Sequence, residues 1–154
     1  MANKIQNFDT GEKDNSNIIH LDLDPKINIE NKIYFKNLLK KIAECSLDNL
    51  EENLENLYHV DAEFNGFHPI NEIKGIEEIK NKYLIPLKKA FPDLERRNNL
   101  VIGGAFRDKV FVSFISHLTG TFTNEWLGVK PTNKTIFLRT CEAHQITNNK
   151  IIKS

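Results

Sequence analysis

The C-terminal half of the chain alternates between apolar and polar residues over three long stretches, and this alternation constrains the fold more than any other feature. The stretches are residues 94–106, 109–123 and 134–147. A period of two is the pattern of β-strands that cover one face. Arg107-Asp108 and Asn148-Asn149 separate strands as two-residue turns, and the asparagine pair suits positive φ. The pattern predicts a meander of long antiparallel strands, with a last strand beginning at Ile151.

Three helices are predicted before this meander. Apolar residues recur at helical spacing from Glu30, and again after Ser46, which offers an N-cap. A third helix opens at Gly75, after a strand over residues 60–67. Pro86 lies inside the third helical pattern, where its ring excludes a backbone hydrogen bond, so a bend or break is expected there.

Helices followed by long strands predict an α+β fold in one domain. The helices can be covered only by the concave face of a curved sheet, and Gly103-Gly104 offers a bend that allows the curvature. Residues 1–28 show little periodicity and are expected to form a mobile N-terminal tail, although residues 18–23 could dock as an extended piece. The folded domain is then expected to span residues 29–154.

The composition argues against several partners. Lys plus Arg and Asp plus Glu both total 21, so no basic field exists to attract nucleic acid or an anionic membrane. Cys45 and Cys141 are isolated and read as two reduced thiols. Neither a metal-ligand cluster nor a phosphate-binding glycine loop is present, so no cofactor is expected. Without an export signal or a membrane-spanning run, a cytoplasmic protein is expected.

Several blocks occur in an order and spacing that resemble the SnoaL-like polyketide cyclase family, a branch of the superfamily named after nuclear transport factor 2. The blocks are residues 58–62, 68–72, 90–97, 103–104 and 120–134, followed by Leu138-Arg139, Glu142 and an Asn-Lys-Ile turn. The resemblance implies a cone-shaped, curved antiparallel sheet with about three helices on its concave face, enclosing a pocket. It also implies a homodimer.

The resemblance further implies a cofactor-free, intramolecular aldol-type ring closure on a small apolar or polycarbonyl molecule, or a related isomerase or dehydratase reaction. The alternative is a non-enzymatic protein that binds a small ligand on the same fold. The family pattern places a His two residues before the loop glycine, where this chain has Leu118, and an acidic pocket residue beyond the last hairpin, which has no counterpart up to Ser154. Both departures favour the alternative.

Three residues are candidates for acid–base catalysis. His117 is predicted to share a strand face with Ser113 and Ile115, a mixed face that suits a pocket wall. Glu142 is flanked by apolar neighbours, and a buried carboxylate is costly unless paired or functional. His68 lies in a loop near the expected pocket mouth. Two of them have plainer interpretations. His117 could form a hydrogen bond to a neighbouring strand, and Glu142 could face the solvent.

Five further residues are candidates for ligand binding. Trp126 and Phe122 lie on a loop that could close the pocket, although dimer packing would explain them equally well. Arg139 could bind a ligand carboxylate or pair with Asp93 or Glu95. His144 follows Glu142 on the same strand face, and Tyr83 lies on the apolar side of the third helix. Arg96-Arg97 reads as a solvated or salt-bridged pair.

Overall fold

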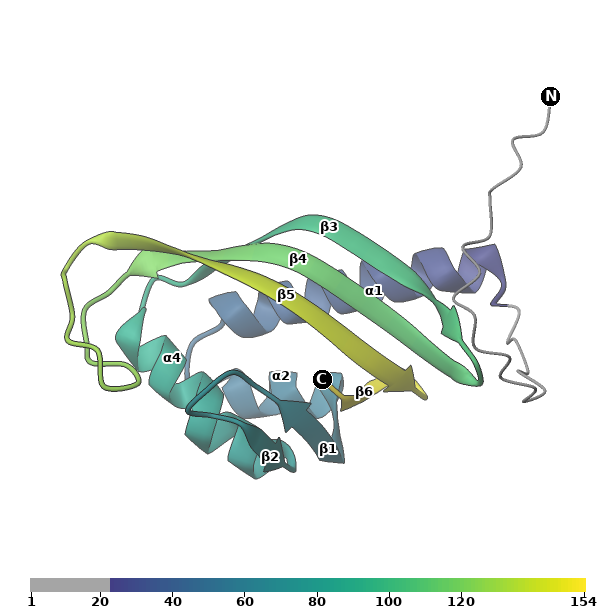
Figure 1. Cartoon of the computed structure of the whole chain (residues 1–154), viewed down its shortest axis with the longest axis horizontal. Helices are drawn as coiled ribbons and strands as arrows, with labels where there is room; N and C mark the ends of the chain where they lie inside the picture. The colour runs from purple at the N-terminus through teal and green to yellow at the C-terminus, as the bar shows by residue number, and fades with distance from the viewer. Residues whose placement is uncertain (1–22) are drawn as a thin grey trace, which may run out of the picture.

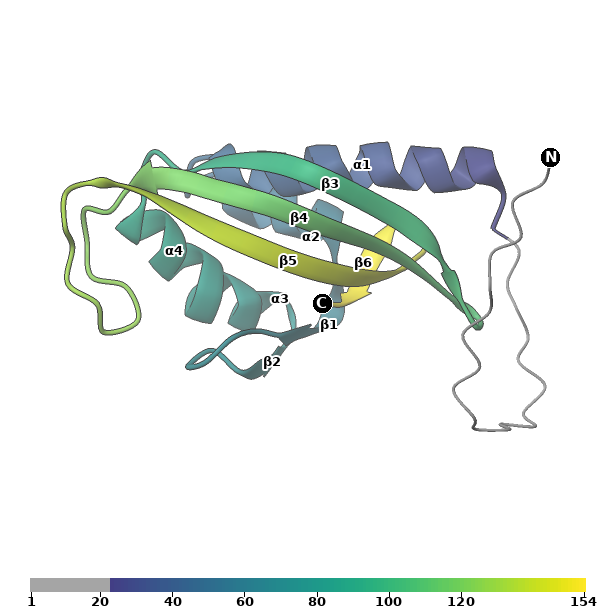
Figure 2. The same cartoon turned by 45° about the horizontal axis from the view of Figure 1, so that its top comes forward.

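The α+β architecture predicted from the alternation is confirmed by a computed structural model, which describes residues 23–154 (Figures 1 and 2). The helical segments are α1 (Pro25–Glu44), α2 (Leu50–Leu57), α3 (Ile76–Glu78), the π-helical turn η1 (Ile79–Leu84) and α4 (Ile85–Ala90). The strands are β1 (Tyr58–Asn65), β2 (Glu72–Lys74), β3 (Glu95–Phe106), β4 (Lys109–Thr121), β5 (Thr135–Thr147) and β6 (Lys150–Lys153). The expected docking of residues 18–23, and most of the expected tail, fall on residues 1–22, outside the described residues.

The six strands form one curved sheet in the order β2-β1-β6-β5-β4-β3. The long strands β3, β4 and β5 pair antiparallel, as the meander predicts, and curve over the helices (Figure 1). The sheet is mixed rather than wholly antiparallel, because β6 inserts between β5 and β1 and pairs parallel with β1. The first and last strands in chain order therefore lie side by side in the sheet.

Helix α1 begins at Pro25, earlier than the predicted start at Glu30. Asp24 is its N-cap, accepting a hydrogen bond from the backbone nitrogen of Lys26 at 2.7 Å, and proline at the first helical position is pre-set for helical φ. The Asp-Pro pair is thus a start signal that outweighs the weak periodicity of this segment. No helix within residues 23–154 is long and apolar enough to cross a membrane.

The third helical run is irregular at the position that Pro86 predicts. Its backbone widens into η1 immediately before the proline, and the N–H of Ile85 donates to the carbonyl of Lys80, five residues back. A π turn lets the chain pass the proline ring without a clash against the preceding turn. The run therefore continues to Ala90 and keeps its apolar side on the sheet.

The hairpin turns follow the prediction, whereas the bulge does not. Arg107, Asn148 and Asn149 all adopt positive φ, between 49° and 58°. The register of β3 shifts between Asn98 and Leu100, not at Gly103-Gly104, which pairs regularly with β4. Gly103 instead allows α1 to approach the sheet closely. Asn28 of α1 donates to the Gly103 carbonyl at 3.0 Å, and a Cβ at Gly103 would overlap the Asn28 side chain.

Candidate functional site

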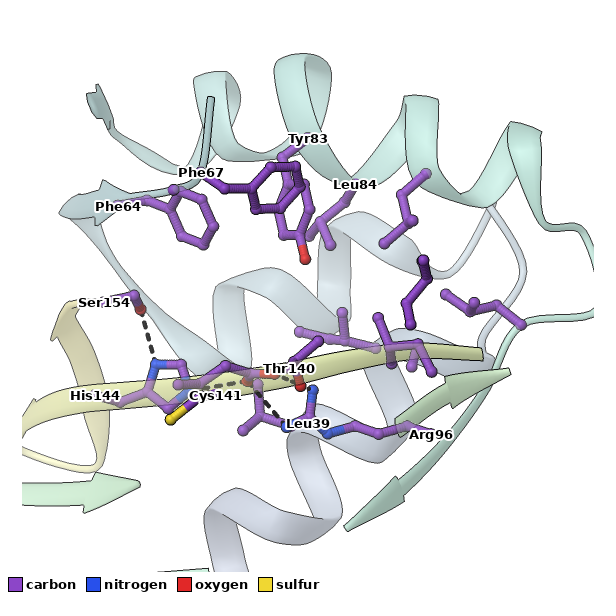
Figure 3. A pocket seen from close by; sticks show the side chains of 18 of the residues that line it. Leu39, Phe64, Phe67, Tyr83, Leu84, Arg96, Thr140, Cys141, His144 and Ser154 are labelled. Carbon is purple, nitrogen blue, oxygen red and sulfur yellow. Dashed lines mark hydrogen bonds and ion pairs between the residues drawn. The ribbon is translucent and has the colours of Figure 1, made fainter. Parts of the chain in front are cut away.

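A cavity of about 560 Å³ lies between the concave face of the sheet and the helices (Figure 3). Its lining is mainly apolar, with leucine and isoleucine side chains from α1, α2, η1 and α4 facing Leu118 of β4. Aromatic side chains gather on one side of the cavity, and the polar groups of β3 and β5 lie opposite them (Figure 3). These aromatic residues are Phe64, Phe67, Tyr83 and Trp126, and a fifth aromatic residue, Tyr58, also lines the cavity.

The polar side is organised by a buried ion pair between β3 and β5. Arg96 donates to Glu142 through two nitrogens, Nη1 to Oε1 at 3.0 Å and Nη2 to Oε2 at 2.9 Å. The exposed fractions of these side chains are 5% and 22%. Arg96 also donates to Ser116 and Asn98, and its guanidinium carbon lies 5.5 Å from the centre of the Phe114 ring. Two parallel hydrogen bonds fix both groups in one geometry.

This pairing sets the charge of Glu142. Burial raises the pKa of the Glu142 carboxyl, but a hydrogen bond from His144 and the charge and hydrogen bonds of Arg96 together outweigh burial and lower that pKa to about 2. Glu142 is therefore a carboxylate across the physiological range. A carboxylate with so low a pKa is a weak proton acceptor and a strong hydrogen-bond acceptor.

His144 links Glu142 to the end of the sheet. Its side chain is buried, with Nε2 at 3.3 Å from a Glu142 oxygen and Nδ1 at 2.9 Å from the hydroxyl of Ser154. An ionised carboxylate only accepts, so in the neutral imidazole Nε2 carries the proton and Nδ1 accepts from the Ser154 hydroxyl. Arg96, Glu142, His144 and Ser154 thus form one hydrogen-bonded chain along the cavity (Figure 3), hereafter the polar chain.

Three other polar groups of the cavity wall are available to a ligand. The Tyr83 hydroxyl points into the cavity (Figure 3), and burial together with the negative charge of Glu142 raises the pKa of Tyr83, which keeps the phenol protonated. The indole nitrogen of Trp126 and the hydroxyl of Thr140 are buried and have no hydrogen-bond partner within residues 23–154. Such groups are costly unless another molecule satisfies them.

The expectation that His117 lines the cavity needs correction. The cavity side of β4 carries Val112, Phe114, Ser116 and Leu118, whereas His117 lies on the opposite face. Successive strand residues face opposite ways, so burial of Leu118 turns His117 outward. There its Nδ1 lies 2.7 Å from the side-chain oxygen of Asn99. This contact matches the plainer interpretation, a hydrogen bond to a neighbouring strand.

The remaining candidates divide between the cavity and its surroundings. Glu142, His144, Tyr83 and Trp126 meet at the cavity. His68 is exposed in the loop after β1 and does not line the cavity.

Phe122 and Arg139 have other positions. Phe122 is buried beside the cavity and stacks on Phe91 at 5.1 Å. The exposed Arg139 is at the cavity edge, paired across the strands with outward-facing His117. Its proposed partner Asp93 instead accepts two hydrogen bonds from Thr121, at 2.6 and 2.7 Å.

Arg96 is the residue that sequence reasoning missed. Its partner Glu142 lies 46 residues away, and an arginine beside Arg97 at a strand start resembles solvated charge. The one available signal was period two, which places Arg96 on the face of buried Leu94. A buried arginine requires an acceptor, and Glu142 is the carboxylate on the cavity side of β5.

Within residues 23–154, no group of three or more His, Cys, Asp or Glu side chains is arranged to hold a metal ion. Cys45 and Cys141 are both free. Cys45 is partly buried at the end of α1, where its Sγ donates to the Ile42 carbonyl at 3.4 Å. Besides the polar chain and the Tyr83 phenol, the cavity wall includes one further buried ionisable group with a basic side chain, Lys88.

A curved sheet that closes over helices around a cavity places the fold in the nuclear transport factor 2-like class. The chain belongs to the SnoaL-like polyketide cyclase family, because the model of that family matches residues 36–154. A comparison with curated proteins found no match.

Solved structures agree with this fold. A candidate SnoaL-like polyketide cyclase from Jannaschia sp. CCS1 superposes with a TM-score of 0.62 at 18% identity, over 86% of this chain and 87% of that one. A nuclear transport factor 2-like superfamily protein from Salmonella enterica gives 0.64 at 14% identity, over 83% and 87%. IdmH, a candidate polyketide cyclase from Streptomyces antibioticus, gives 0.57 at 18% identity, over 77% and 86%. At these identities the likeness concerns the fold alone.

Proposed function

We propose that this protein is a cofactor-free cyclase that binds a small polycarbonyl compound and closes a ring by an intramolecular aldol-type reaction. The observation that carries the proposal is the polar chain buried along one side of a mainly apolar cavity. Family membership supports it, because polyketide cyclase is the activity for which the family is named. An isomerase or dehydratase would use the same proton transfers.

In this mechanism His144 is the base and Glu142 orients it. Ring closure requires removal of a proton from a carbon next to a carbonyl. With a pKa of about 2, Glu142 is too weak a base for that step, but its carboxylate holds the imidazole tautomer and stabilises the imidazolium that forms. The proton reaches Nδ1 through the Ser154 hydroxyl, which takes the substrate proton as it gives up its own.

The developing enolate needs hydrogen-bond donors, and the cavity offers neutral ones. The Tyr83 phenol stays protonated and points into the cavity, and the Thr140 hydroxyl has no protein partner. Donors held in a water-poor site stabilise an oxyanion more strongly than water does. The aromatic side chains around Tyr83 would pack against the planar, conjugated part of a polycarbonyl ligand.

A second candidate function is binding without chemistry. One observation favours it, namely that both ring nitrogens of His144 already have partners within the protein. Glu142 likewise accepts from Arg96 and His144, so no proton acceptor of the polar chain is free. A non-enzymatic carrier of a small apolar molecule would keep the cavity and use the polar chain only for orientation.

The two candidates differ in one measurement, the exchange of a carbon-bound proton. The bicyclic ketone 2-tetralone is a suitable probe, and its uptake of deuterium from heavy water can be followed by NMR. The cyclase proposal expects the wild-type protein to accelerate exchange and His144→Phe to abolish the acceleration. The matched control is His117→Phe, on the outer face, which should retain it. Binding of 2-tetralone without any acceleration would support the carrier and refute the cyclase.

We further propose that two copies associate through the outer face of the sheet. Leu100, Ile102 and Phe137 are exposed there to 46%, 57% and 67%. Leu100 pairs across the strands with Ile115, and Phe137 lies further along the same face, opposite Thr119. Apolar side chains clustered on one face are typical of a protein interface. Light scattering should give a dimer for the wild type and a monomer for Phe137→Lys. Val129→Lys, at an equally exposed loop position, should remain dimeric, and a monomeric wild type would contradict the proposal.

A further inference from the structure

One buried lysine lines the cavity outside the polar chain, Lys88 of α4. Lys88 lines the cavity although its exposed fraction is only 7%. Its Nζ donates to the backbone carbonyls of Ala43 at 2.9 Å and Cys45 at 2.7 Å, at the end of α1. In the part of the chain that the structure describes, no carboxylate forms an ion pair with it. A buried lysine without an acidic partner is rare.

This hydrogen-bond pattern is complete for a neutral amine. A neutral amine has two N–H donors and one lone pair, and two carbonyls accept from Lys88, whereas an ammonium carries a third donor. Burial lowers the pKa of Lys88, opposed by the Cys45 thiol, by the hydrogen bond to Cys45 and by the charge of Glu44. The environment therefore raises the neutral fraction of the amine, the form in which nitrogen is a nucleophile.

We propose that Lys88 is a nucleophilic residue that condenses with a ketone carbonyl of the ligand to form a Schiff base. The amine adds to the carbonyl carbon to give a carbinolamine. Loss of water, which carries the carbonyl oxygen and two protons, leaves a carbon–nitrogen double bond, and protonation of that nitrogen gives an iminium ion. Neither oxidant nor reductant is consumed, and hydrolysis regenerates the amine.

The Schiff base answers a difficulty in the proposed chemistry. Glu142 is a weak base, and His144 has both nitrogens engaged, so the polar chain offers no strong, free proton acceptor. An iminium ion withdraws electrons and makes the neighbouring C–H more acidic, so a weaker base is enough to form the enamine. The enamine carbon can then attack a second carbonyl of the same ligand, which closes the ring.

The competing interpretation is that Lys88 only caps the end of α1. Cations near helix C-termini are stabilising, and the two carbonyls are among those that a helix leaves without partners. A capping role does not require the lysine to line a cavity, and Lys88 does line it. The next residue, Lys89, is exposed and provides the matched comparison for reactivity.

The test uses acetylacetone, a small 1,3-diketone that converts an amine into a conjugated enaminone with loss of one water. We expect a single early adduct, seen in the intact mass as acetylacetone less water and assigned to Lys88 by peptide mapping. Because burial lowers the pKa of Lys88 and so raises its neutral fraction, Lys88 should carry the adduct before the exposed Lys89 does. Lys88→Met and Lys88→Arg should lose the adduct, and Lys89→Met should keep it. Equal labelling of Lys88 and Lys89 in the wild-type protein would overturn the proposal without any variant.

The inference rests on the proposed function for its class of ligand, and the two can fail separately. Lys88→Arg keeps a cation and donors for the α1 carbonyls but cannot form a Schiff base. Binding of 2-tetralone to this variant, followed by Trp126 fluorescence, reports on the cavity alone. If Lys88→Arg still binds 2-tetralone and the wild-type protein forms no acetylacetone adduct, the Schiff base is rejected and the proposed binding site is not. If the wild-type protein did not bind 2-tetralone at all, the proposed function itself would be rejected.

Discussion

Replacing Arg96 by methionine should destabilise the protein severely near pH 7. Methionine keeps the unbranched stem but removes the charge, which leaves the Glu142 carboxylate buried without its counter-ion. Removing one partner of a buried ion pair costs about 3–5 kcal/mol, against a total stability of about 5–15 kcal/mol for a domain. Ser116 and Asn98 each lose one hydrogen bond from Arg96, although Asn98 still accepts from Ser116.

The pH dependence follows from the low pKa of Glu142. A carboxyl whose folded pKa lies below its unfolded value stabilises the folded state above the unfolded pKa. Here the pKa falls from 4.5 to about 2, and this difference corresponds to about 3 kcal/mol. That contribution is present above pH 4.5 and is lost as the pH falls toward 2. In Arg96→Met the arginine no longer offsets the effect of burial, so the pKa of Glu142 should rise. The difference in unfolding free energy between this variant and the wild type should therefore shrink as the pH falls.

Urea unfolding near pH 7 and near pH 3 measures both effects. Arg97→Met is the matched control, since Arg97 is 72% exposed and contacts Glu95 at 3.3 Å. Exposed pairs contribute about 0–1 kcal/mol, so this variant should be close to wild type. The double variant Arg96→Met/Glu142→Leu should recover most of the lost stability, because the orphaned charge is gone. An Arg96→Met variant no less stable than Arg97→Met would refute the reasoning.

Three further outcomes are expected. Gly103→Ala should lower the free energy of unfolding by about 1–3 kcal/mol, because the new Cβ would meet Asn28 of α1. Gly104→Ala is the control and should be tolerated, since nothing lies within 4 Å of its Cβ position. Equal effects of the two substitutions would argue against the tight contact with α1. Glu142→Gln should flatten the acid limb of the stability profile between about pH 5 and 2, and an unchanged limb would contradict its assigned pKa. Bound 2-tetralone should change the fluorescence of Trp126, the only tryptophan, and an unchanged spectrum at saturation would place the ligand elsewhere.

The fold could be predicted where local rules act alone. Period two fixed the long strands to within about two residues of their observed ends, and the Asn148-Asn149 turn has the positive φ that its residues favour. Pro86 marked the irregular turn for a similarly local reason. The parallel pairing of β1 with β6 has no local signature, since it depends on where the chain returns after the meander.

The site was harder to predict because both faces of β4 mix polar and apolar residues. Ser116 interrupts the buried face, and Ile115 lies beside His117 on the outer one, so pattern alone does not say which face meets the helices. The bulge between Asn98 and Leu100 reverses the parity of β3 along its length. Arg96 precedes that bulge, and only the assembled sheet brings it to Glu142.

The placement of charge in this protein argues for function beyond stability. A buried ion pair can commonly be replaced by apolar side chains with no loss of stability, so folding alone does not require one. Here the Arg96–Glu142 pair, His144 and Lys88 all lie against the same cavity, while Val112 and Phe114 nearby pack as ordinary core. Ionisable groups with a shifted pKa at a cavity, here Glu142 and Lys88, are typical of sites that bind or transform a ligand. A ligand in that cavity, as proposed above, would account for their position there.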